Sequence, residues 1–512
     1  MQTTTGWRRD MPAFLGFLEQ KLACRVRRHE VLFDLRYYEA DLSAWKLRFS
    51  DLSPLIYVSA SEVATLGDAA VSENIGELLR ARNLTERQPL VLIAGDGQEL
   101  KRYLRINSIP AAVLDGMDQQ EITDSRRPTA EFLDRVVRQM TLGILSPYEI
   151  NKPVTGSRFF GRESDVRRIQ SSGDTNYAVM GIRRIGKTSL LRELERRLRE
   201  QAREDNIKEA EKRVFFMDCS PIRSAEDLLR EIVRHYHPHE LVRISNRQFP
   251  LYFPDFLRRM KSRYGGQLIL LLDEFDVLLN MDVPNESLLN VLRTASNEGH
   301  CRFVIAGFRD LLAQSSQLHS PLLNFAKTLR LKEFSREDAG SMILGPLSNL
   351  RVQVERENEV VERIFEETAG QPHLIQFHCS YIVDRLERNN TRRLSPEDLL
   401  GVYDDENFRA SVLDIFMDNT THLEKAMVFA LISEASETLE QFDQENIERS
   451  LLKQGISITL DDMEYACRNL ELAGVFAKQG WHYRFAIPLF PRILNKNYNV
   501  CYLLQKLKRE GI

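Results

Sequence analysis

Short apolar runs alternate with amphipathic stretches along most of this 512-residue chain. Three runs in its middle are nearly free of polar residues: Tyr177–Met180, Leu268–Leu272 and Phe303–Gly307. Runs of this length are typical of strands buried on both faces. The first is followed by leucines at helical spacing, at positions 190, 191, 194 and 198. Apolar strands that alternate with helices predict a parallel sheet covered by helices.

The first 145 residues show the same alternation and predict a separate α/β unit. We expect strands over Leu55–Ser59, Pro89–Ala94 and Pro110–Leu114, and helices near Phe14–Arg27, Ile75–Ala81, Glu99–Leu104 and Ala130–Met140. No catalytic constellation stands out in this unit. Asp115 and Asp118 follow its third strand, and we interpret them as solvated loop acids rather than metal ligands.

The segment SPYEINKPVTGSR (146–158) carries two prolines and a glycine, so it is read as a linker. We therefore divide the chain into an α/β domain (1–145), a core (146–347), a helical subdomain (348–415) and a last domain (416–512). The last domain is expected to contain helices His422–Ala435, Gln444–Gln454 and Thr459–Ala473, then a hairpin from Val475–Lys478 and His482–Ala486. Three helices followed by a hairpin predict a winged-helix-like domain.

The most specific motif is GIRRIGKTS, which fits G-x-x-x-x-G-K-[ST] through Gly181, Gly186, Lys187 and Thr188 and ends at Ser189. A predicted strand precedes it and a predicted helix follows it, which is the setting of a phosphate-binding loop. Backbone N–H groups of such a loop and the new helix N-terminus surround phosphate oxygens. Lys187 is expected to reach the β- and γ-phosphates, and Thr188 to bind Mg²⁺. ATP or ADP with Mg²⁺ are the predicted cofactors.

Acids and arginines at the ends of the other two strands complete the candidate site. Asp273 is expected to contact the metal ion, and Glu274 to orient or deprotonate the attacking water. Arg309 follows the third strand, where it either meets the γ-phosphate or pairs with a carboxylate at the surface. Arg183 and Arg184 lie inside the loop, and Arg184 is counted among the nucleotide-binding candidates. Both arginines either touch phosphate or pair with acids elsewhere in the chain.

Composition adds little to this picture. A formal net charge of -4 gives no general reason to expect nucleic acid or an anionic membrane as a partner. The six cysteines lack metal or redox spacing, so reduced thiols are expected. No export signal or membrane-spanning run is recognised, and the protein is expected to be cytoplasmic.

Several ordered motifs resemble one family. FFGRESD (159–165) is similar to the Gly-Arg-Glu motif that opens the signal-transduction ATPases with numerous domains (STAND), although Asp165 stands where that family usually has glutamate. RRIGKTSLL looks like the phosphate loop of the archaeal-ATPase-like branch of the AAA+/ASCE superfamily. Gly370-Gln371-Pro372 resembles the family's Gly-x-Pro motif. The predicted terminal winged helix matches as well.

The resemblance implies an α/β ATPase core, a helical domain and a winged helix that closes over the nucleotide. It implies that Arg162 and Glu163 lie near the adenine and ribose entrance. It also implies that Pro372 packs near the base and that Arg309 is the sensor arginine. The family's closing histidine has no clear match; His373, His378 and His482 are expected to be surface or core residues. By analogy the role would be in signalling, stress or antiviral defence.

Three hypotheses for function follow. The first is a slow ATPase switch, closed with ADP and open with ATP, which acts on a protein partner or assembles with itself. The alternative is an ATP-dependent DNA-binding protein resembling origin-recognition initiators. The helix within Thr459–Leu472 carries four acids and one base, a net of -3, which disfavours nucleic acid there. The third is a nucleotide-binding scaffold without turnover, against which Glu274 argues.

Overall fold

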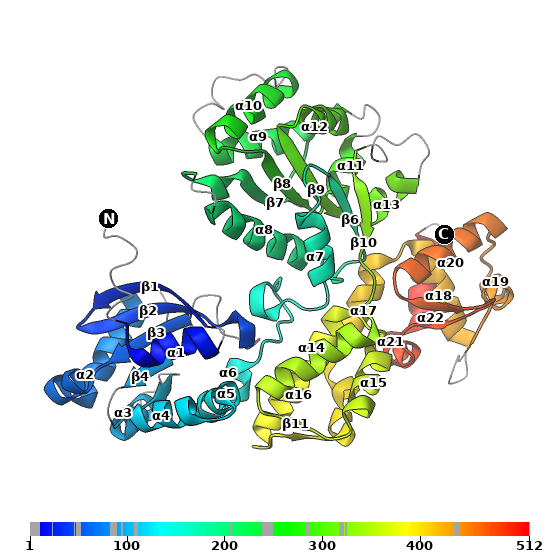
Figure 1. The fold of residues 1–512 in the computed structure, drawn as a ribbon. Helices are drawn as coiled ribbons and strands as arrows, with labels where there is room; N and C mark the ends of the chain where they lie inside the picture. Colours follow the sequence, from blue (N-terminus) through cyan, green and yellow to red (C-terminus); the bar gives the residue numbers. More distant parts are fainter. Residues whose placement is uncertain are drawn as a thin grey trace.

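The computed structural model describes residues 11–22, 24–45, 47, 53–81, 90–93, 96–106, 111–204, 207–237, 249–282, 287–316, 322, 325–434 and 441–510. Figure 1 shows the N-terminal unit in blue and cyan, the central sheet in green, a group of helices in yellow-green and yellow, and a C-terminal unit in orange and red. The yellow helices lie between the N-terminal and C-terminal units.

The N-terminal unit contains a five-stranded sheet in the order β1-β2-β3-β4-β5. The strands are β1 (Arg25–Leu32), β2 (Leu35–Asp41), β3 (Ser53–Val58), β4 (Leu90–Ile93) and β5 (Ala112–Leu114). β1 to β3 pair antiparallel, whereas β3 to β5 pair parallel. The helices are α1 (Ala13–Lys21), α2 (Ala60–Ala81), α3 (Gln98–Ile106), α4 (Gly116–Asp124), α5 (Pro128–Gln139) and α6 (Leu142–Leu145).

The helix expected over Phe14–Arg27 is too long, and the hairpin of β1 and β2 was not predicted. α1 ends at Lys21, and the chain is already extended in β1 from Arg25. The indole N–H of Trp45 donates to the Leu22 carbonyl at 3.0 Å, and the Val26 N–H donates to Glu19 Oε1 at 2.9 Å. These non-local bonds end the helix where its apolar spacing would let it continue, because tertiary contacts override local preference.

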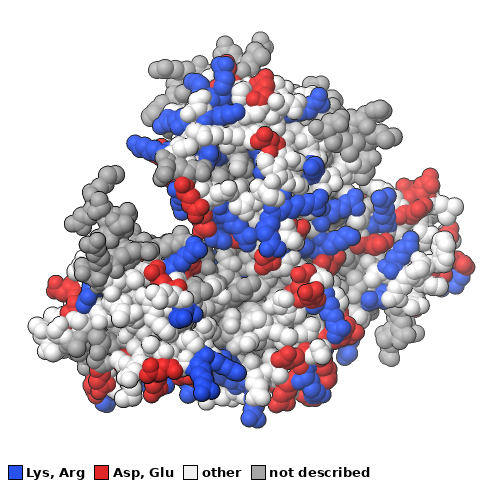
Figure 2. Space-filling model, in the orientation of Figure 1, with Lys and Arg blue, Asp and Glu red and all other residues white. Residues whose placement is uncertain are grey.

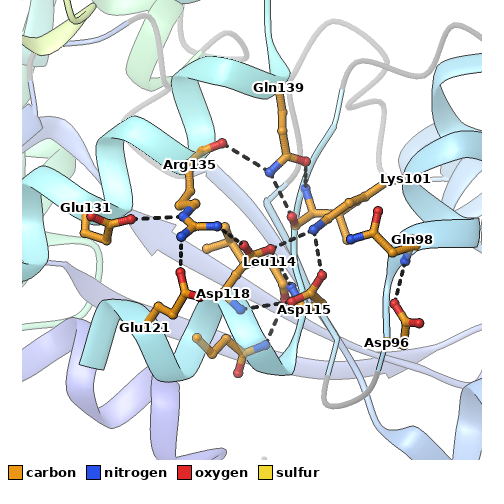
Figure 3. Close-up of polar contacts among 12 residues, drawn as sticks. Asp96, Gln98, Lys101, Leu114, Asp115, Asp118, Glu121, Glu131, Arg135 and Gln139 are labelled. Atoms are coloured by element: carbon orange, nitrogen blue, oxygen red, sulfur yellow. Dashed lines mark hydrogen bonds and ion pairs between the residues drawn. The ribbon is translucent and has the colours of Figure 1, made fainter. Parts of the chain in front are cut away.

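Asp115 and Asp118 are not solvated loop acids, because both side chains are buried in a polar network (Figure 3). They form a capping box at the start of α4. Lys101 Nζ donates to one carboxylate oxygen of each at 2.7 Å, and Arg135 donates to Asp118 at 2.9 Å. The Gln139 amide hydrogen-bonds the backbone of β5 in both directions at 2.9 Å. The network therefore ties α3, α4 and α5 to the last strand of the sheet.

One face of this sheet shares its hydrophobic core with the yellow helices α14 (Arg336–Asn349), α15 (Glu357–Thr368) and α16 (Pro372–Arg388). Phe132 and Val136 of the N-terminal unit belong to the same buried cluster as Met342 and Ile375. Asn349 also donates to the Trp45 carbonyl at 2.6 Å. Apolar burial therefore joins the two parts of the chain.

The central sheet is parallel throughout and runs in the order β10-β6-β9-β8-β7. Its strands are β6 (Tyr177–Met180), β7 (Val214–Asp218), β8 (Leu268–Asp273), β9 (Cys301–Gly307) and β10 (Lys327–Arg330). Its helices are α7 (Glu163–Gln170), α8 (Lys187–Glu204), α9 (Ala225–Tyr236), α10 (Phe249–Arg263), α11 (Asp276–Asp282), α12 (Ser287–Asn297) and α13 (Arg309–Ser316). The predicted parallel sheet is confirmed, with β9 between β6 and β8.

Beyond β10, α14 packs against α15 and α16 rather than against the sheet. The short strands β11 (Gln353–Val354) and β12 (Arg393–Leu394) pair beside these helices, and α17 (Glu406–Asn419) follows. By packing, the sheet core therefore ends near β10, although the predicted division places the helical subdomain from residue 348.

The C-terminal unit contains α18 (His422–Glu434), α19 (Gln444–Lys453), α20 (Leu460–Leu472), β13 (Phe476–Gln479), β14 (His482–Phe485), α21 (Phe490–Asn497) and α22 (Val500–Arg509). β13 and β14 pair antiparallel. These elements lie close to the expected bounds, while the winged-helix assignment stays a prediction. Among the described helices, none is both long enough and apolar enough to cross a bilayer.

Replacing Lys101 by methionine is expected to destabilise the N-terminal sheet by about 2 kcal/mol at neutral pH, because the buried carboxylate of Asp115 loses its cation and Asp118 keeps only Arg135. Burial alone would raise the pKa of Asp115, but the hydrogen bonds from Lys101 and from the Asp118 backbone N–H lower it below 3.8. The stabilisation is therefore present above that pH and is lost as the pH falls through the lowered value.

Denaturant unfolding between acidic and neutral pH measures this effect. The difference between wild type and Lys101→Met should shrink in acid. The exposed neighbour Arg102, replaced by methionine, is the control and should show little change. A pH-independent difference would mean that packing, not charge, accounts for the loss.

Candidate nucleotide-binding site

The loop between β6 and α8 depends on its glycines for two different reasons. A Cβ on Gly181 would lie 2.7 Å from Ile185 Cγ2 and 3.2 Å from the Leu331 carbonyl oxygen, so no side chain fits there. Gly186 has φ of +104°, in the region that favours glycine. Ile182 and Ile185 are buried and anchor the loop to the core. The backbone thus curls tightly between two buried isoleucines.

Lys187 lies inside this curl, and its side chain is almost fully buried. Its ammonium group donates to the carbonyl of Gly181 at 2.9 Å and to that of Ile182 at 3.1 Å. Burial lowers the pKa of Lys187, while the nearby carboxylates of Glu274 and Asp273 act in the opposite direction. An ammonium group has three N–H donors, so one remains for a phosphate oxygen.

Thr188 and Asp273 meet at the foot of the loop. The Thr188 hydroxyl donates to Asp273 Oδ2 at 2.6 Å. Asp273 is only 2% exposed, and burial raises its pKa against the opposing effects of the Thr188 hydrogen bond and the Lys187 charge. A hydroxyl and a carboxylate are hard oxygen ligands that fit Mg²⁺. No cluster of three or more His, Cys, Asp or Glu side chains suited to a metal occurs among the described residues, so phosphates and water would have to complete such a shell.

Glu274 follows directly and lines the cavity in front of the loop. Its φ of +51° is left-handed, an uncommon conformation for a residue other than glycine. Burial raises the pKa of Glu274, the charges of Asp273 and Asp276 raise it further, and Lys187 lowers it. A carboxylate with a raised pKa is better suited to accept a proton from water.

Asp276 holds the backbone instead of facing the cavity. Its carboxylate accepts hydrogen bonds from the backbone N–H groups of Phe308 and, at 2.8 Å, Leu311. A Cβ on Gly307 would lie 2.6 Å from Asp276 Oδ2, so the glycine makes room for the carboxylate. Asp276 therefore fixes the start of α13, the helix that begins with Arg309.

A cavity of about 810 Å³ opens in front of the loop. Its wall includes the linker residues 149–154, the start of α16, and part of α17. Arg162 is buried in this wall, donates to the Lys332 carbonyl, and lies 4.9 Å above the Phe334 ring. Gly161 permits that packing, because a Cβ there would meet the same ring at 2.7 Å.

The cavity brings together most of the residues predicted for the site. Its wall contains Arg162, Arg184, Gly186, Lys187, Thr188, Ser189, Glu274 and Pro372. Asp273 is linked to it through Thr188, and Gly181 through the Lys187 ammonium group. The Ser189 hydroxyl accepts a hydrogen bond from the Val154 N–H at 3.1 Å, so its side chain holds the linker. Which of these residues contact a nucleotide stays a prediction.

Arg309 does not line the cavity. Its guanidinium group donates to both carboxylate oxygens of Glu424 on α18, at 3.1 and 2.6 Å, and to the Asn419 carbonyl. Arg309 was expected either to meet the γ-phosphate or to pair with a carboxylate. In the structure it pairs with a carboxylate. Glu424 is almost fully buried and was not singled out in the sequence.

The two loop arginines also bind the C-terminal half of the chain. Arg183 donates to Asp418 Oδ2 at 2.6 Å, and its backbone N–H donates to Asn419 Oδ1 at 2.9 Å. Arg184 donates to Asp414 Oδ2 at 3.2 Å. Asp414 and Asp418 are four residues apart, so they lie on one face of α17. The spacing of these acids marks one face of a helix, but nothing local in the sequence links that face to Arg183 and Arg184.

His373 completes this contact. Its Nε2 lies 3.0 Å from Arg184 Nη1, and its side chain is part of the cavity wall. Burial first, and then the Arg184 charge, lower the pKa of His373 to about 4. The ring is therefore neutral at pH 7 and accepts the arginine's hydrogen bond. His378 is fully buried beside Glu367, and His482 is exposed.

Comparison with known proteins agrees with this geometry. Residues 169–314 match the family described as an AAA domain. None of the curated proteins matches the chain. The ORC2 protein of Aeropyrum pernix, solved with ADPNP and ADP, is 15% identical, with a TM-score of 0.52 over 71% of this chain and 97% of that chain.

Two further solved structures are similar at lower scores. The Walker-type ATPase of Pyrococcus abyssi is 15% identical, with a TM-score of 0.48 over 68% of this chain and 99% of that chain. The RuvB branch migration motor of Thermotoga maritima is also 15% identical, with a TM-score of 0.36 over 66% and 96%. At these identities only the fold is comparable, and of these three structures only ORC2 has a TM-score above 0.5. The chain contains a nucleotide-binding AAA-type P-loop domain.

Lys187→Ala is expected to weaken ATP and ADP binding at least about tenfold, since a charge-assisted hydrogen bond to phosphate is worth roughly 1.5–3 kcal/mol. Titration with a fluorescent nucleotide measures the change. Lys506→Ala on α22, outside the cavity lining, is the control. Equal affinities for wild type and Lys187→Ala would contradict the assignment of this loop as the phosphate site.

Proposed function

We propose that the protein is a Mg²⁺-dependent, slowly hydrolysing ATPase that works as a STAND-like conformational switch. The observation that carries this proposal is the set of contacts from the nucleotide face of the core to α17 and α18. Arg183 and Arg184 pair with Asp418 and Asp414, and Arg309 pairs with Glu424. The loop that is expected to bind phosphate thus also contacts helix α17 through ion pairs.

These pairs offer a physical route from nucleotide to conformation. Arg184 lies in the cavity wall, where a γ-phosphate would compete with Asp414 for its guanidinium group. ADP lacks that phosphate, so it would leave the pair in place. A ligand shifts a conformational equilibrium only by its differential affinity for the two forms. Competition for Arg184 would supply such a difference.

The chemical step would use the residues at the end of β8. Glu274 would hold and deprotonate the attacking water, helped by its raised pKa. Lys187 would bind phosphate through its remaining N–H donor. Thr188 and Asp273 would hold Mg²⁺, which neutralises charge on the phosphates when bound. The output would be contact with a protein partner or self-assembly.

Replacing Glu274 by glutamine is expected to leave nucleotide affinity nearly unchanged and to slow hydrolysis about 10²- to 10⁴-fold, the usual contribution of a general base. Phosphate release under saturating ATP measures the rate. Wild-type turnover no faster than that of Glu274→Gln would favour the scaffold without turnover.

The double variant Asp414→Asn, Asp418→Asn is expected to loosen the contact between the loop and α17. Both side chains keep their size but lose the charge that holds Arg183 and Arg184. With ADP bound, the variant should therefore resemble wild type with a non-hydrolysable ATP analogue in light-scattering mass and protease sensitivity. The exposed acids Asp461 and Asp462 of α20, changed to asparagine, are the matched control.

Two results would oppose the switch. One is a wild-type protein whose size and protease sensitivity are the same with ADP and with the ATP analogue. The other is a double variant that still differs between the two nucleotides as wild type does.

A second candidate is ATP-dependent DNA binding, the alternative that the sequence kept open. The acids Asp461, Asp462 and Glu464 of α20 are exposed, so this helix would repel the phosphates of a DNA groove. DNA binding by this chain would therefore need another surface.

A further inference from the structure

Seven cations are carried by α7, by β10 with the residue shortly after it, and by the hairpin β13–β14, which are distant in sequence. They are Arg167 and Arg168 of α7, Lys327 and Arg330 of β10, Lys332 just after it, and Lys478 and Arg484 of the hairpin β13–β14. All but Arg484 are exposed, and Arg484 is partly exposed. Figure 2 shows Lys and Arg gathered in a band across the middle of one face, over α7 and β10 and towards α20.

The cations of this band, named here the basic band, differ from most of the arginines on α8. There, Arg192, Arg196 and Arg197 each pair with a glutamate one turn away. Within the described part of the chain, none of the seven band residues forms an ion pair with a carboxylate. Lys478 does lie 5.7 Å from the centre of the Tyr483 ring. Like charges gathered without paired carboxylates repel one another, and a bound polyanion would relieve this repulsion.

Edge protection alone does not explain the band. β10 is the edge strand of the central sheet, and lysines on edge strands discourage pairing with other chains. That accounts for Lys327 and Arg330. It does not account for cations on α7 or on the hairpin, which lie outside this sheet.

A cleft of about 860 Å³ gives the band a shape. Four band residues line it: Arg330, Lys332, Lys478 and Arg484. Its acids are Glu333 beside β10, Glu362 and Glu366 on α15, and Glu471 on α20. Glu362 is already paired with Arg336 at 2.5 Å. Three of the four acids therefore lie on α15 and α20, while the β10 and hairpin wall carries the four cations and Glu333. This wall has a net positive charge, which favours a polyanion there.

The hairpin adds an aromatic group. Trp481 lies in its turn, between Lys478 and Arg484 in sequence, and is 89% exposed. Exposed aromatic rings beside cations are a feature of proteins that bind nucleic acid by stacking and by backbone charge. An acidic protein partner would satisfy the cations but would not use this ring in the same way.

We propose that the basic band binds the sugar–phosphate backbone of nucleic acid, and that α20 does not enter a groove. The band includes residues of the core and of the C-terminal hairpin that line one cleft, so both can contact the same strand of nucleic acid. Backbone contact through lysine and arginine is independent of base sequence. This proposal does not depend on hydrolysis or on the switch.

The test is fluorescence anisotropy with a labelled DNA duplex of mixed sequence and with its single strand, between about 50 and 200 mM salt. The variant Lys327→Ala, Arg330→Ala, Lys478→Ala removes three band cations. The matched control Arg102→Ala, Arg105→Ala, Arg126→Ala removes three exposed cations of the N-terminal unit that also lack ion pairs among the described residues. The full chain is used throughout.

Wild type should bind at least one of the two DNA forms, with affinity that falls steeply as salt rises. The band variant should bind at least about tenfold more weakly and lose about three from the salt slope, one for each phosphate contact. The control should behave as wild type. Quenching of tryptophan fluorescence by the single strand, abolished in Trp481→Ala, would add stacking to backbone contact.

Absence of salt-dependent DNA binding by wild type, or equal losses in the band variant and the control, would overturn the proposal. Fluorescent-nucleotide titration checks that the band variant is folded, because none of its three residues lines the nucleotide cavity. DNA binding without any ATP turnover would support the proposed role of the basic band and contradict the proposed ATPase switch, so the two proposals can fail separately.

Discussion

Charge balance behind the phosphate loop is the constraint on which the rest of the site depends. A buried ammonium group at Lys187 needs carbonyl oxygens and nearby carboxylates, and Asp273 and Glu274 need the ammonium group in turn. Burial acts against the charged form of all three. The order of the strands supplies the solution, since β8 delivers its acids across β9 to the foot of the loop. The strand order of the sheet therefore creates the charge balance that lets this site bind phosphate.

The same loop carries a second set of charges that face outward. Arg183 and Arg184 project towards α17. The side chains of their partners there, Asp418 and Asp414, are 36% and 52% exposed. Surface ion pairs of this kind are individually weak, roughly 0–1 kcal/mol each. A contact built from several weak pairs can hold two parts of a protein together and still yield to a stronger ligand. The third ion pair, between Arg309 and Glu424, is more buried than the other two and should be the strongest part of the contact.

The sequence predicted the parts of this protein whose signals are local. Strands β6, β8 and β9 could be predicted because each is a continuous apolar run, and the loop could be predicted because its glycines, lysine and threonine have fixed spacing. Strands β7 and β10 were not predicted, and β10 is an edge strand that carries a lysine, a threonine and an arginine. The partners of Arg183, Arg184 and Arg309 were not, because they lie more than 100 positions away along the chain. The hairpin of β1 and β2 was missed because Arg25–Leu32 carries many charges, which hide a strand pattern; its pairing with β2 across a tight turn makes it extended.

The shared core between the N-terminal sheet and α14–α16 has a mechanical consequence. Close-packed apolar interfaces resist shear, so these two parts should move as one body. The helices lie next to the nucleotide cavity, and the sheet extends away from it (Figure 1). A small rotation of α16 about the cavity would then become a larger displacement at the distant strands β1 and β2. The N-terminal unit would therefore amplify small movements of α16 beside the phosphate loop into larger movements at its far edge.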